Sequence, residues 1–227
     1  IHKALNYWFT AKPVCLNWWY NQIGIPKTLG TVFILFEKQL TPVEKQNAIT
    51  VMENAKFGMT GQNKVWLAGN VMMRALLQND YELVKMARDT IASEIVTGGA
   101  EGIKDDWCFH QHGAQQQFGN YGLSFVSGMS FFSGLFSGTS LAFDDKQLSI
   151  LSTLIDKGYR WVIWKGMMDV NALGRQLFHH APVHKALSLA FAASELGGGE
   201  SDECVAVATA LLRDNYPAPA VNVLTGH

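Results

Sequence analysis

The stretch DDKQLSILSTLIDKGYRWV, residues 144–162, decides the fold class. It opens with Asp144, and Gln147 follows three residues later, which is the pattern of a helix-capping box. Behind this start, apolar residues recur at steps of three and four: Leu148, Leu151, Ile155, Tyr159 and Val162. The stretch therefore predicts a long amphipathic helix with one buried face.

The same helical pattern recurs in the first half of the chain. Thr41-Pro42-Val43-Glu44 is a second capping box, with proline at the first helical position. Segments near 64–78 and 82–96 also space their apolar residues as helices do, and the turn-prone pair Asn79-Asp80 separates them. We therefore predict two helices that meet at this turn.

A further helix is expected near the end of the chain, where Ser201 precedes Asp202 and Glu203 as an N-cap. Its inner face would carry Cys204, Val207 and Leu211. Strand signals are thin, because no run of alternating β-branched residues lies between hairpin turns. The sequence predicts an all-α fold with two unusual loops, 12–30 and 98–122, and long polar-aromatic loops are where function tends to reside.

Composition and charge bound the classes of partner. The 227 residues are 48% hydrophobic and only 16% charged, so they can build a substantial core. The formal net charge of −1 gives no sign of a preference for nucleic acid or an anionic membrane, and no apolar run is long enough to span a bilayer. The three cysteines form no CxxC pair, so neither a structural zinc site nor a disulfide framework is indicated.

The stretch DDWCFHQHG at 105–113, which runs on to GNYG at 119–122, holds the side chains most suited to proton transfer. It brings His110, His112 and Tyr121 into one glycine-rich segment. His exchanges protons near neutral pH, and Tyr joins it where nearby positive charge favours the phenolate. A hydrogen-bonded polar turn would explain the same pattern without any chemistry.

A metal site is a third interpretation of this segment. His110 and His112, together with Asp105, Asp106 or the pair His179-His180, contain the nitrogen and oxygen atoms that a transition metal binds. A His-x-His pair without a partner at fixed spacing does not by itself define such a site.

Two adjacent tryptophans stand in NWWYNQIG at 17–24. Neighbouring side chains point to different sides of a regular element, so Trp18 and Trp19 are not expected to be buried together. Aromatic faces with polar edges stack on sugar rings in binding clefts. The alternative is that one of the two tryptophans has a packing role.

Two further stretches carry candidate polar groups. Asn63 lies in TGQNKVW at 60–66, where a loop enters a helix, and it could be no more than a helix-start residue. Arg175 follows a glycine in WVIWKGMMDVNALGRQ at 161–176 and could hold a carboxylate or sulfate in fork geometry. A surface salt bridge would also account for this arginine.

Together these stretches resemble the polysaccharide lyase family of chondroitin AC lyases, hyaluronate lyases and xanthan lyases. The matching pieces are NWWYNQIGIPKTL at 17–29, TGQNKVW at 60–66, DWCFHQHGAQQQFGNYG at 106–122 and WVIWKGMMDVNALGRQ at 161–176, in the family's order and spacing. The resemblance implies a toroid of antiparallel helix pairs followed by β-sandwich domains. Residues 1–227 are then expected to be an incomplete part of that (α/α) toroid, without the β domains, and a poor enzyme alone.

The resemblance also implies a chemistry, which is β-elimination across C4–C5 of a uronic acid without a metal or other cofactor. Asn63 would neutralise the substrate carboxylate. His112 and Tyr121, nine residues apart as in the family, would exchange the protons, with Tyr121 protonating the leaving oxygen and either residue acting as base. Arg175 would favour the phenolate and bind the acidic sugar.

The implied substrate platform consists of Trp18 and Trp19. One departure concerns His179, which stands where the family has a second arginine, four residues after Arg175. Histidine is shorter and only partly charged at neutral pH, which bears on whether a sulfated polymer is favoured. The partners implied are an acidic polysaccharide and the β domains of the same chain, in a secreted or periplasmic enzyme.

Two other classes compete with the lyase. A metal-dependent glycan hydrolase would use the histidines to activate water. A non-catalytic glycan-binding domain would keep the tryptophans, but it would have no need of both His112 and Tyr121. A metal-free glycosidase would need a facing carboxylate pair, for which Asp105-Asp106 is the candidate.

Overall fold

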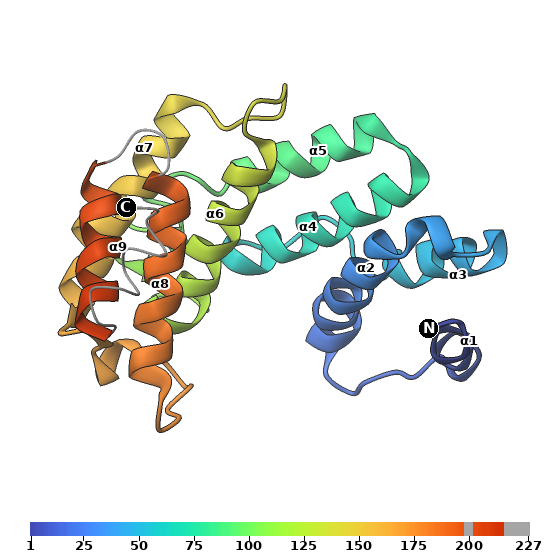
Figure 1. Ribbon diagram of the computed structural model, residues 1–227, viewed down its shortest axis with the longest axis horizontal. Helices are drawn as coiled ribbons and strands as arrows, with labels where there is room; N and C mark the ends of the chain where they lie inside the picture. The colour runs from blue at the N-terminus through green and yellow to red at the C-terminus, as the bar shows by residue number, and fades with distance from the viewer. Residues whose placement is uncertain (198–201, 216–227) are drawn as a thin grey trace. The chain divides into compact units, whose positions relative to one another are not determined.

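The computed structural model describes residues 1–197 and 202–215, and these residues are mainly helical (Figure 1). The α-helices are α1 (His2–Ala11), α2 (Ile25–Leu35), α3 (Pro42–Met52), α4 (Gly61–Gln78), α5 (Tyr81–Ala92), α6 (Leu123–Phe136), α7 (Asp145–Thr153), α8 (Ala181–Gly197) and α9 (Asp202–Asn215). Short π or 3-10 segments are η1 (Tyr20–Gly24), η2 (Glu37–Gln39), η3 (Phe118–Gly122), η4 (Leu154–Gly158), η5 (Tyr159–Val162) and η6 (Val170–Ala172). The prediction of an all-α fold is confirmed.

Short strands that the sequence did not reveal interrupt the helices. Strands β1 (Gly102–Ile103) and β2 (Phe109–His110) pair antiparallel, as do β3 (Ile163–Trp164) and β4 (Met167–Met168). Each strand is two residues long, which is too short for an alternating pattern to be visible in the sequence.

The chain divides into two compact units, Ile1–Glu94 and Ile95–His227. In the first unit, α1, α2, α3 and α4 share one apolar cluster. Phe9 of α1 stacks on Phe33 of α2 with ring centroids 6.0 Å apart, and Met52 and Leu77 close the cluster from α3 and α4. This core fixes α1 and α3 beside each other.

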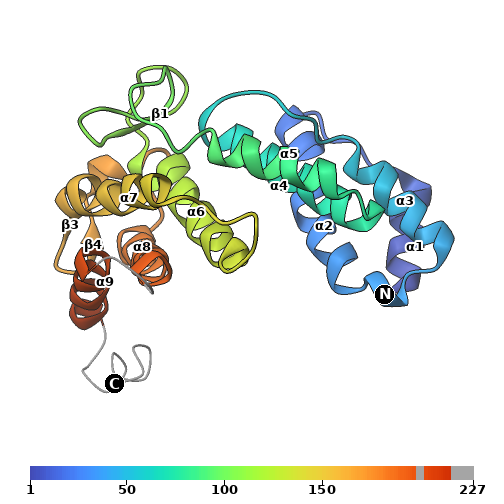
Figure 2. The same ribbon diagram turned by 90° about the horizontal axis from the view of Figure 1, so that it is seen from above.

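The helices α4 and α5 form an antiparallel pair in the first unit (Figure 2). The turn between them is the predicted Asn79-Asp80: Asn79 ends α4 in the left-handed conformation with φ 55°, and Asp80 accepts a hydrogen bond from the Leu83 N–H at 3.0 Å. The prediction for this turn is confirmed. The second helix is shorter than predicted, because α5 ends at Ala92.

In the second unit, α8 packs against both α6 and α9.

The two predicted capping boxes are confirmed: Thr41 caps α3 and Asp144 caps α7. Ser201 lies outside the described residues, as does the side chain of Cys204. Leu211 on α9 is buried, as expected for the inner face of this helix.

The helix predicted over 144–162 is not uniform. It is α-helical only as far as Thr153 and continues as η4 and η5. The predicted inner face is nevertheless correct at its centre, because Leu151, Ile155 and Tyr159 are fully buried. A Cβ on Gly158 would lie 2.4 Å from the Trp107 carbonyl oxygen, so glycine lets the backbone of a distant loop pack closely on the segment that follows the α-helix.

The prediction of a loop over 12–30 is wrong for most of this range. Helical structure begins at Trp18 and continues through η1 into α2, so only residues 12–17 are irregular. Pro26 stands within the first turn of α2, a position that tolerates proline. The loop over 98–122 exists, but it contains β1, β2 and η3. Among the described residues, no helix is long and apolar enough to cross a membrane.

Candidate active site

The segment that carries His112 is held by one carboxylate. Glu101 accepts hydrogen bonds from the Gln111 side-chain amide and from the Gly113 N–H, the latter at 3.0 Å. Strands β1 and β2 close the base of the segment by pairing Gly102 with His110. The loop is thus tied on both sides of His112 and is fixed without help from a regular helix.

His112 itself has a strained backbone. Its φ of 59° lies in the left-handed region, and Gly113 follows with φ 75°. A non-glycine residue in this region costs conformational free energy, and such strained residues cluster at functional sites. The ring of His112 meets the ring of Tyr121 edge to face, with centroids 4.9 Å apart at 85°. The structure therefore brings these two predicted residues into contact.

Tyr121 differs from His112 in exposure. It lies on η3 and is only 6% exposed, whereas His112 is on the surface. The segment η3 is anchored from behind by Tyr159, whose phenol donates a hydrogen bond to the Phe118 carbonyl oxygen at 3.0 Å. Burial raises the pKa of Tyr159 well above its usual value, so this phenol stays protonated and structural.

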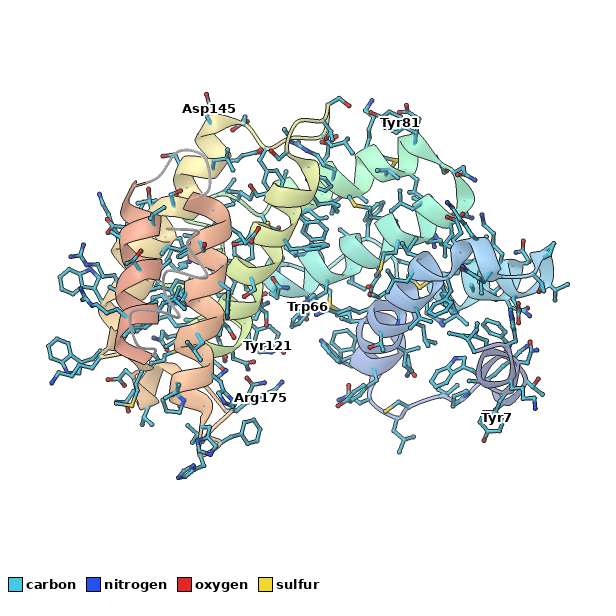
Figure 3. All side chains as sticks on the ribbon, viewed as in Figure 1. Tyr7, Trp66, Tyr81, Tyr121, Asp145 and Arg175 are labelled. Carbon is cyan, nitrogen blue, oxygen red and sulfur yellow. The ribbon has the colours of Figure 1, made fainter. Side chains whose placement is uncertain are left out.

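Glycines let a second segment lie against η3. A Cβ on Gly119 would be 2.6 Å from the Ala172 carbonyl oxygen, and one on Gly174, where φ is 65°, would be 3.1 Å from the Gln117 side-chain oxygen. Arg175 follows directly and is exposed (Figure 3). The packing of the segment at 172–174 on η3 thus brings Arg175 to the part of the unit that holds Tyr121.

A residue missed in the sequence ties these segments together. Lys185 on α8 is only 8% exposed, and its ammonium group donates hydrogen bonds to the Gly119 carbonyl oxygen and to the Gln176 side-chain oxygen, the latter at 2.7 Å. Burial lowers the pKa of Lys185. The sequence did contain a signal, because Ala181, Lys185 and Leu189 recur at steps of four and place a charge on the apolar stripe of α8.

His179 lies on the exposed segment between Arg175 and α8. Its Nδ1 is 3.2 Å from Nε2 of His180, and the His180 ring is 5.9 Å from that of His184. Three imidazoles therefore stand in a row after Arg175, where the sequence analysis considered only two.

Asn63 lies in the first turn of α4, in the first unit. The start of this helix is anchored by Glu94, whose carboxylate accepts from the Gly61 N–H at 2.6 Å and pairs with Lys64 at 2.9 Å. Asn63 is 6% exposed, and its buried side-chain oxygen has no hydrogen-bond partner among the described residues. Buried amide oxygens normally have a partner, so this unpaired acceptor marks the first turn of α4 as unusual.

The two tryptophans have different environments, as predicted. Trp18 is 42% exposed, whereas Trp19 is half-buried and makes edge contacts with Tyr20 and with Trp66, the latter at 5.5 Å between ring centroids. Trp66 stands three residues after Asn63 on α4, so an aromatic cluster lies beside the Asn63 turn. Its place in TGQNKVW was visible in the sequence, but its role was missed.

A buried amide holds this cluster in place. Asn70, 1% exposed on α4, donates a hydrogen bond to the Ile23 carbonyl oxygen at 3.0 Å and so ties η1 to α4. A Cβ on Gly24 would be 2.8 Å from the Trp19 ring, so the tryptophan lies directly on the backbone of η1. Local contacts with Tyr20 and Gly24 and the distant Trp66 ring together surround Trp19.

The geometry lends no support to the ligand set considered for a metal. Within residues 1–197 and 202–215, no three His, Cys, Asp or Glu side chains gather as a metal would require. Asp106 instead accepts a hydrogen bond from the Cys108 N–H at 2.9 Å, and this bond lowers its pKa. Asp106 thus stabilises a turn.

The first unit thus carries an aromatic face near a buried amide, and the second carries a His–Tyr contact on a loop that Glu101 holds. Residues 1–194 match the sequence profile described as "Polysaccharide lyase family 8, N terminal alpha-helical domain". The chain belongs to this family, as the resemblance predicted.

Individual relatives agree with this assignment. The chain is 31% identical to the chondroitinase-AC of Pedobacter heparinus over 180 residues, which is 77% of this chain and 26% of that protein. It is 27% identical to the xanthan lyase of Bacillus sp. (strain GL1) over 178 residues, covering 76% and 19% of the two chains. The chain thus spans about a quarter or less of the length of these relatives.

The fold is shared with a solved xanthan lyase from Paenibacillus. The TM-score is 0.86 with 21% sequence identity, and the match covers 99% of this chain and 24% of that one. This likeness concerns the helical fold. The fold class predicted from the sequence, that of the (α/α) toroid lyases, is therefore confirmed.

Proposed function

We propose that the chain is the helical part of a longer polysaccharide lyase, which cleaves uronic-acid-containing polymers by β-elimination. The observation that carries this proposal is the contact between His112 and Tyr121 in a family 8 domain. In the reaction, a base removes the C5 proton of the uronate and the C4–O bond breaks. Its electron pair leaves with the glycosidic oxygen, which is protonated, and a C4=C5 double bond remains in the product.

The proton transfers belong to His112 and Tyr121. The phenol of Tyr121 protonates the departing oxygen, and either the phenolate or the imidazole takes the C5 proton. The contact distance supports this sharing, because two groups in a common proton pathway have to lie within reach of one sugar ring. The difference in exposure also supports the shared role, since the His112 imidazole faces solvent while the Tyr121 phenol is shielded from it.

Neutralisation of the uronate carboxylate belongs to Asn63. The C5 proton is weakly acidic while the adjacent carboxylate keeps its full charge, so a hydrogen-bond donor at the carboxylate stabilises the carbanion. The burial of the Asn63 amide supports this role, because a donor is worth more where water is excluded.

Substrate binding is assigned to the remaining residues. Arg175 is exposed next to the segment packed on η3, and it binds the acidic sugar and favours the Tyr121 phenolate. His179, on the exposed segment between Arg175 and α8, adds a second nitrogen-bearing side chain for the acidic sugar. Trp18 and Trp19 form the stacking platform, supported by the exposure of the first and by the cluster that fixes the second.

The substrate class follows from the family. Two relatives are called a chondroitinase-AC and a xanthan lyase, and we extend their common substrate type, an acidic polysaccharide, to this chain. Such polymers are too large to enter a cell, so we propose a secreted or periplasmic enzyme. The β domains expected after the helical part would be its intramolecular partners.

The test compares Tyr121→Phe with Tyr7→Phe in the complete protein that carries these residues. Tyr7 is 75% exposed, so its variant controls for the loss of one phenol oxygen. Tyr121→Phe should lower turnover by about 10²–10⁴-fold with little change in substrate affinity, because only a proton-transfer atom is removed. Asn63→Ala should slow the reaction by about 10²–10³-fold.

Turnover is read from the ultraviolet absorbance of the unsaturated product on hyaluronan, chondroitin and xanthan. Products with saturated ends would mean hydrolysis, and a wild-type protein that binds uronans without cleaving them would be a binding domain. Wild-type rates in Tyr121→Phe on the best substrate would refute the mechanism.

A further inference from the structure

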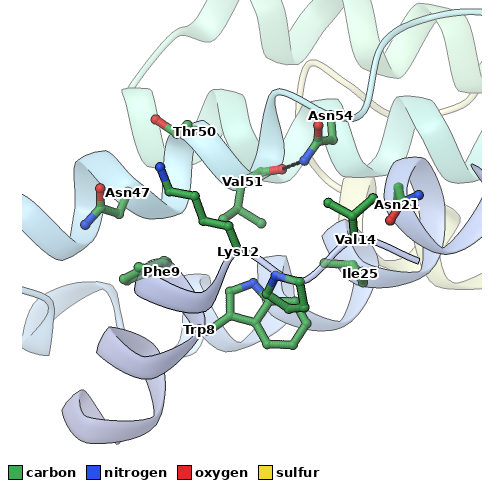
Figure 4. A pocket seen from close by; sticks show the side chains of 11 residues that line it. Trp8, Phe9, Lys12, Val14, Asn21, Ile25, Asn47, Thr50, Val51 and Asn54 are labelled. Atoms are coloured by element: carbon green, nitrogen blue, oxygen red, sulfur yellow. Dashed lines mark hydrogen bonds between the residues drawn. The ribbon is translucent and has the colours of Figure 1, made fainter. Parts of the chain in front are cut away.

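The first unit contains a pocket that none of the residues assigned to the reaction lines. It has a volume of about 380 Å³ and is lined by α1, the irregular residues 12–14, the start of η1 and α2, and the face of α3 (Figure 4). Pockets for small ligands in proteins begin at about 300 Å³, so one sugar residue fits. All of its lining residues belong to the same unit as the core that fixes α1 beside α3.

The α3 wall is a polar face. Asn47, Thr50, Val51 and Asn54 stand at positions i, i+3, i+4 and i+7, so they line one side of the helix and its C-terminal end. Asn54 donates to the Val51 carbonyl oxygen at 3.2 Å, and Thr50 donates to the backbone of its own helix. Asn47 is half-buried and lines the pocket, and no hydrogen bond ties its carboxamide to another described residue, so its donor and its acceptor are both available to a ligand.

The opposite wall combines an aromatic ring with a cation. Trp8 in the last turns of α1 and Lys12, the residue that follows this helix, both line the pocket. Trp8 is half-buried against the apolar core, which fixes its ring. Among the described residues that line the pocket, Lys12 is the only charged one, and it makes no ion pair within residues 1–197 and 202–215.

The rim of the pocket is formed in advance. Lys12 ends α1 in the left-handed conformation, with φ 42°, and its N–H donates to the Trp8 carbonyl oxygen at 2.9 Å. Asn21 then clamps the segment that follows: its side chain accepts from the Cys15 N–H at 2.9 Å and donates to the Cys15 carbonyl oxygen at 2.6 Å. A rim held in this way loses little conformational entropy when a ligand binds.

The lining selects a ligand by its chemistry. A single cation suits one carboxylate, a carboxamide with both groups available suits vicinal hydroxyls, and an indole suits the apolar face of a pyranose ring. We propose that this pocket binds one uronate residue of a polysaccharide, with its carboxylate at Lys12, its hydroxyls at Asn47 and its ring against Trp8. The preference for a carboxylated sugar follows from the lining alone, whereas the choice of a polymer rests on the proposed function.

The role of such a site is to hold the polymer at a second point. A chain bound at two positions on one protein has a raised effective concentration at each of them. The pocket therefore adds to polymer affinity without taking part in proton transfer.

Binding is measured by NMR on the ¹⁵N-labelled chain in its Tyr121→Phe form. The probe is a tetrasaccharide of alternating glucuronate and N-acetylglucosamine, and the neutral control is a tetrasaccharide of N-acetylglucosamine. The signals followed are the Asn47 side-chain amide and the Trp8 indole N–H, assigned by their loss in Asn47→Ala and Trp8→Phe. We expect both signals to shift with the acidic probe and to respond more weakly to the neutral one.

The decisive comparison is between Lys12→Gln and Lys3→Gln. Both lysines are exposed on or next to α1, but Lys3 does not line the pocket. Gln has a side chain of similar length to Lys, so the left-handed backbone at position 12 is no more strained in the variant. Lys12→Gln should weaken binding of the acidic probe at these signals by roughly two- to five-fold, while Lys3→Gln should not. The proposal is overturned if the chemical shifts of the two signals do not change at the highest probe concentration, or if both lysine variants bind the acidic probe equally. This readout needs no turnover, so it stands apart from the test of the lyase chemistry.

Discussion

Replacement of Gly119 by alanine tests the packing that joins the Tyr121 and Arg175 segments. The new Cβ would lie 2.6 Å from the Ala172 carbonyl oxygen and 2.8 Å from the Leu173 Cα. Real Cβ atoms essentially never approach closer than 3.0 Å, so the two backbones must separate by at least 0.4 Å, the difference between 3.0 and 2.6 Å. Both obstacles are backbone atoms, which cannot swing aside as the end of a side chain can.

The expected cost follows from this overlap. Overpacking typically destabilises a protein by about 1–3 kcal/mol, and the better helix propensity of alanine returns up to about 1 kcal/mol. A net loss of about 1–2 kcal/mol would lower the melting temperature by about 2–8 °C for a chain of this size. In the complete enzyme, turnover should fall as well, because η3 carries Tyr121 and the displaced segment leads to Arg175.

Gly134→Ala is the matched control. Gly134 lies inside α6 of the same unit, and a Cβ there would meet only the Glu195 carboxylate at 3.6 Å, an ordinary contact. This variant should be as stable as the wild type or up to about 1 kcal/mol more stable. Urea unfolding of the wild type and both variants, followed by circular dichroism, makes the comparison. If Gly119→Ala unfolds at the same urea concentration as the wild type, the close approach inferred here is wrong.

Three further changes have defined outcomes. Lys185→Met leaves the Gly119 and Gln176 oxygens without their donor and should cost about 1–3 kcal/mol in urea unfolding; an unchanged midpoint would contradict the tie between α8 and η3. The Thr41 N–H and His2 lower the pKa of Glu44 below its usual 4.5. The ionised carboxylate therefore stabilises the fold fully above about pH 4.5, and this stabilisation is lost as the pH falls further. Glu44→Gln should flatten the acid dependence of thermal unfolding, and an unaltered pH profile would contradict this role of Glu44. Chelator treatment of the complete enzyme should leave turnover unchanged, because the proposed mechanism uses no metal, and loss of activity that zinc restores would favour a hydrolase.

Local sequence determined where α3, α5 and α7 begin and where α4 ends. Capping boxes at Thr41 and Asp144 and the turn at Asn79-Asp80 could be read directly, because each depends on residues within one helical turn of each other. The buried face of Leu151, Ile155 and Tyr159 followed from the helical period alone. The change from α-helix to π and 3-10 segments did not follow from that period, and at this point Gly158 packs closely against the backbone of the distant Trp107.

For the site, the sequence by itself determined which residues are present, in which order, and which family they resemble. That was enough to select His112 and Tyr121, whose rings the structure brings into contact. It also separated the environments of Trp18 and Trp19, since adjacent side chains diverge on any regular element.

Only the tertiary structure decided how these residues are held. Lys185 contacts an oxygen 66 positions away in the chain, and Asn70 holds η1 from 47 positions away, so no local pattern reveals either contact. The pocket of Lys12 and Asn47 exists because a shared apolar core packs α1 beside α3. Hydrophobic burial depends on area rather than on sequence position, so it can join residues from anywhere in the chain, and the polar groups that come along with them acquire their partners only in the folded state.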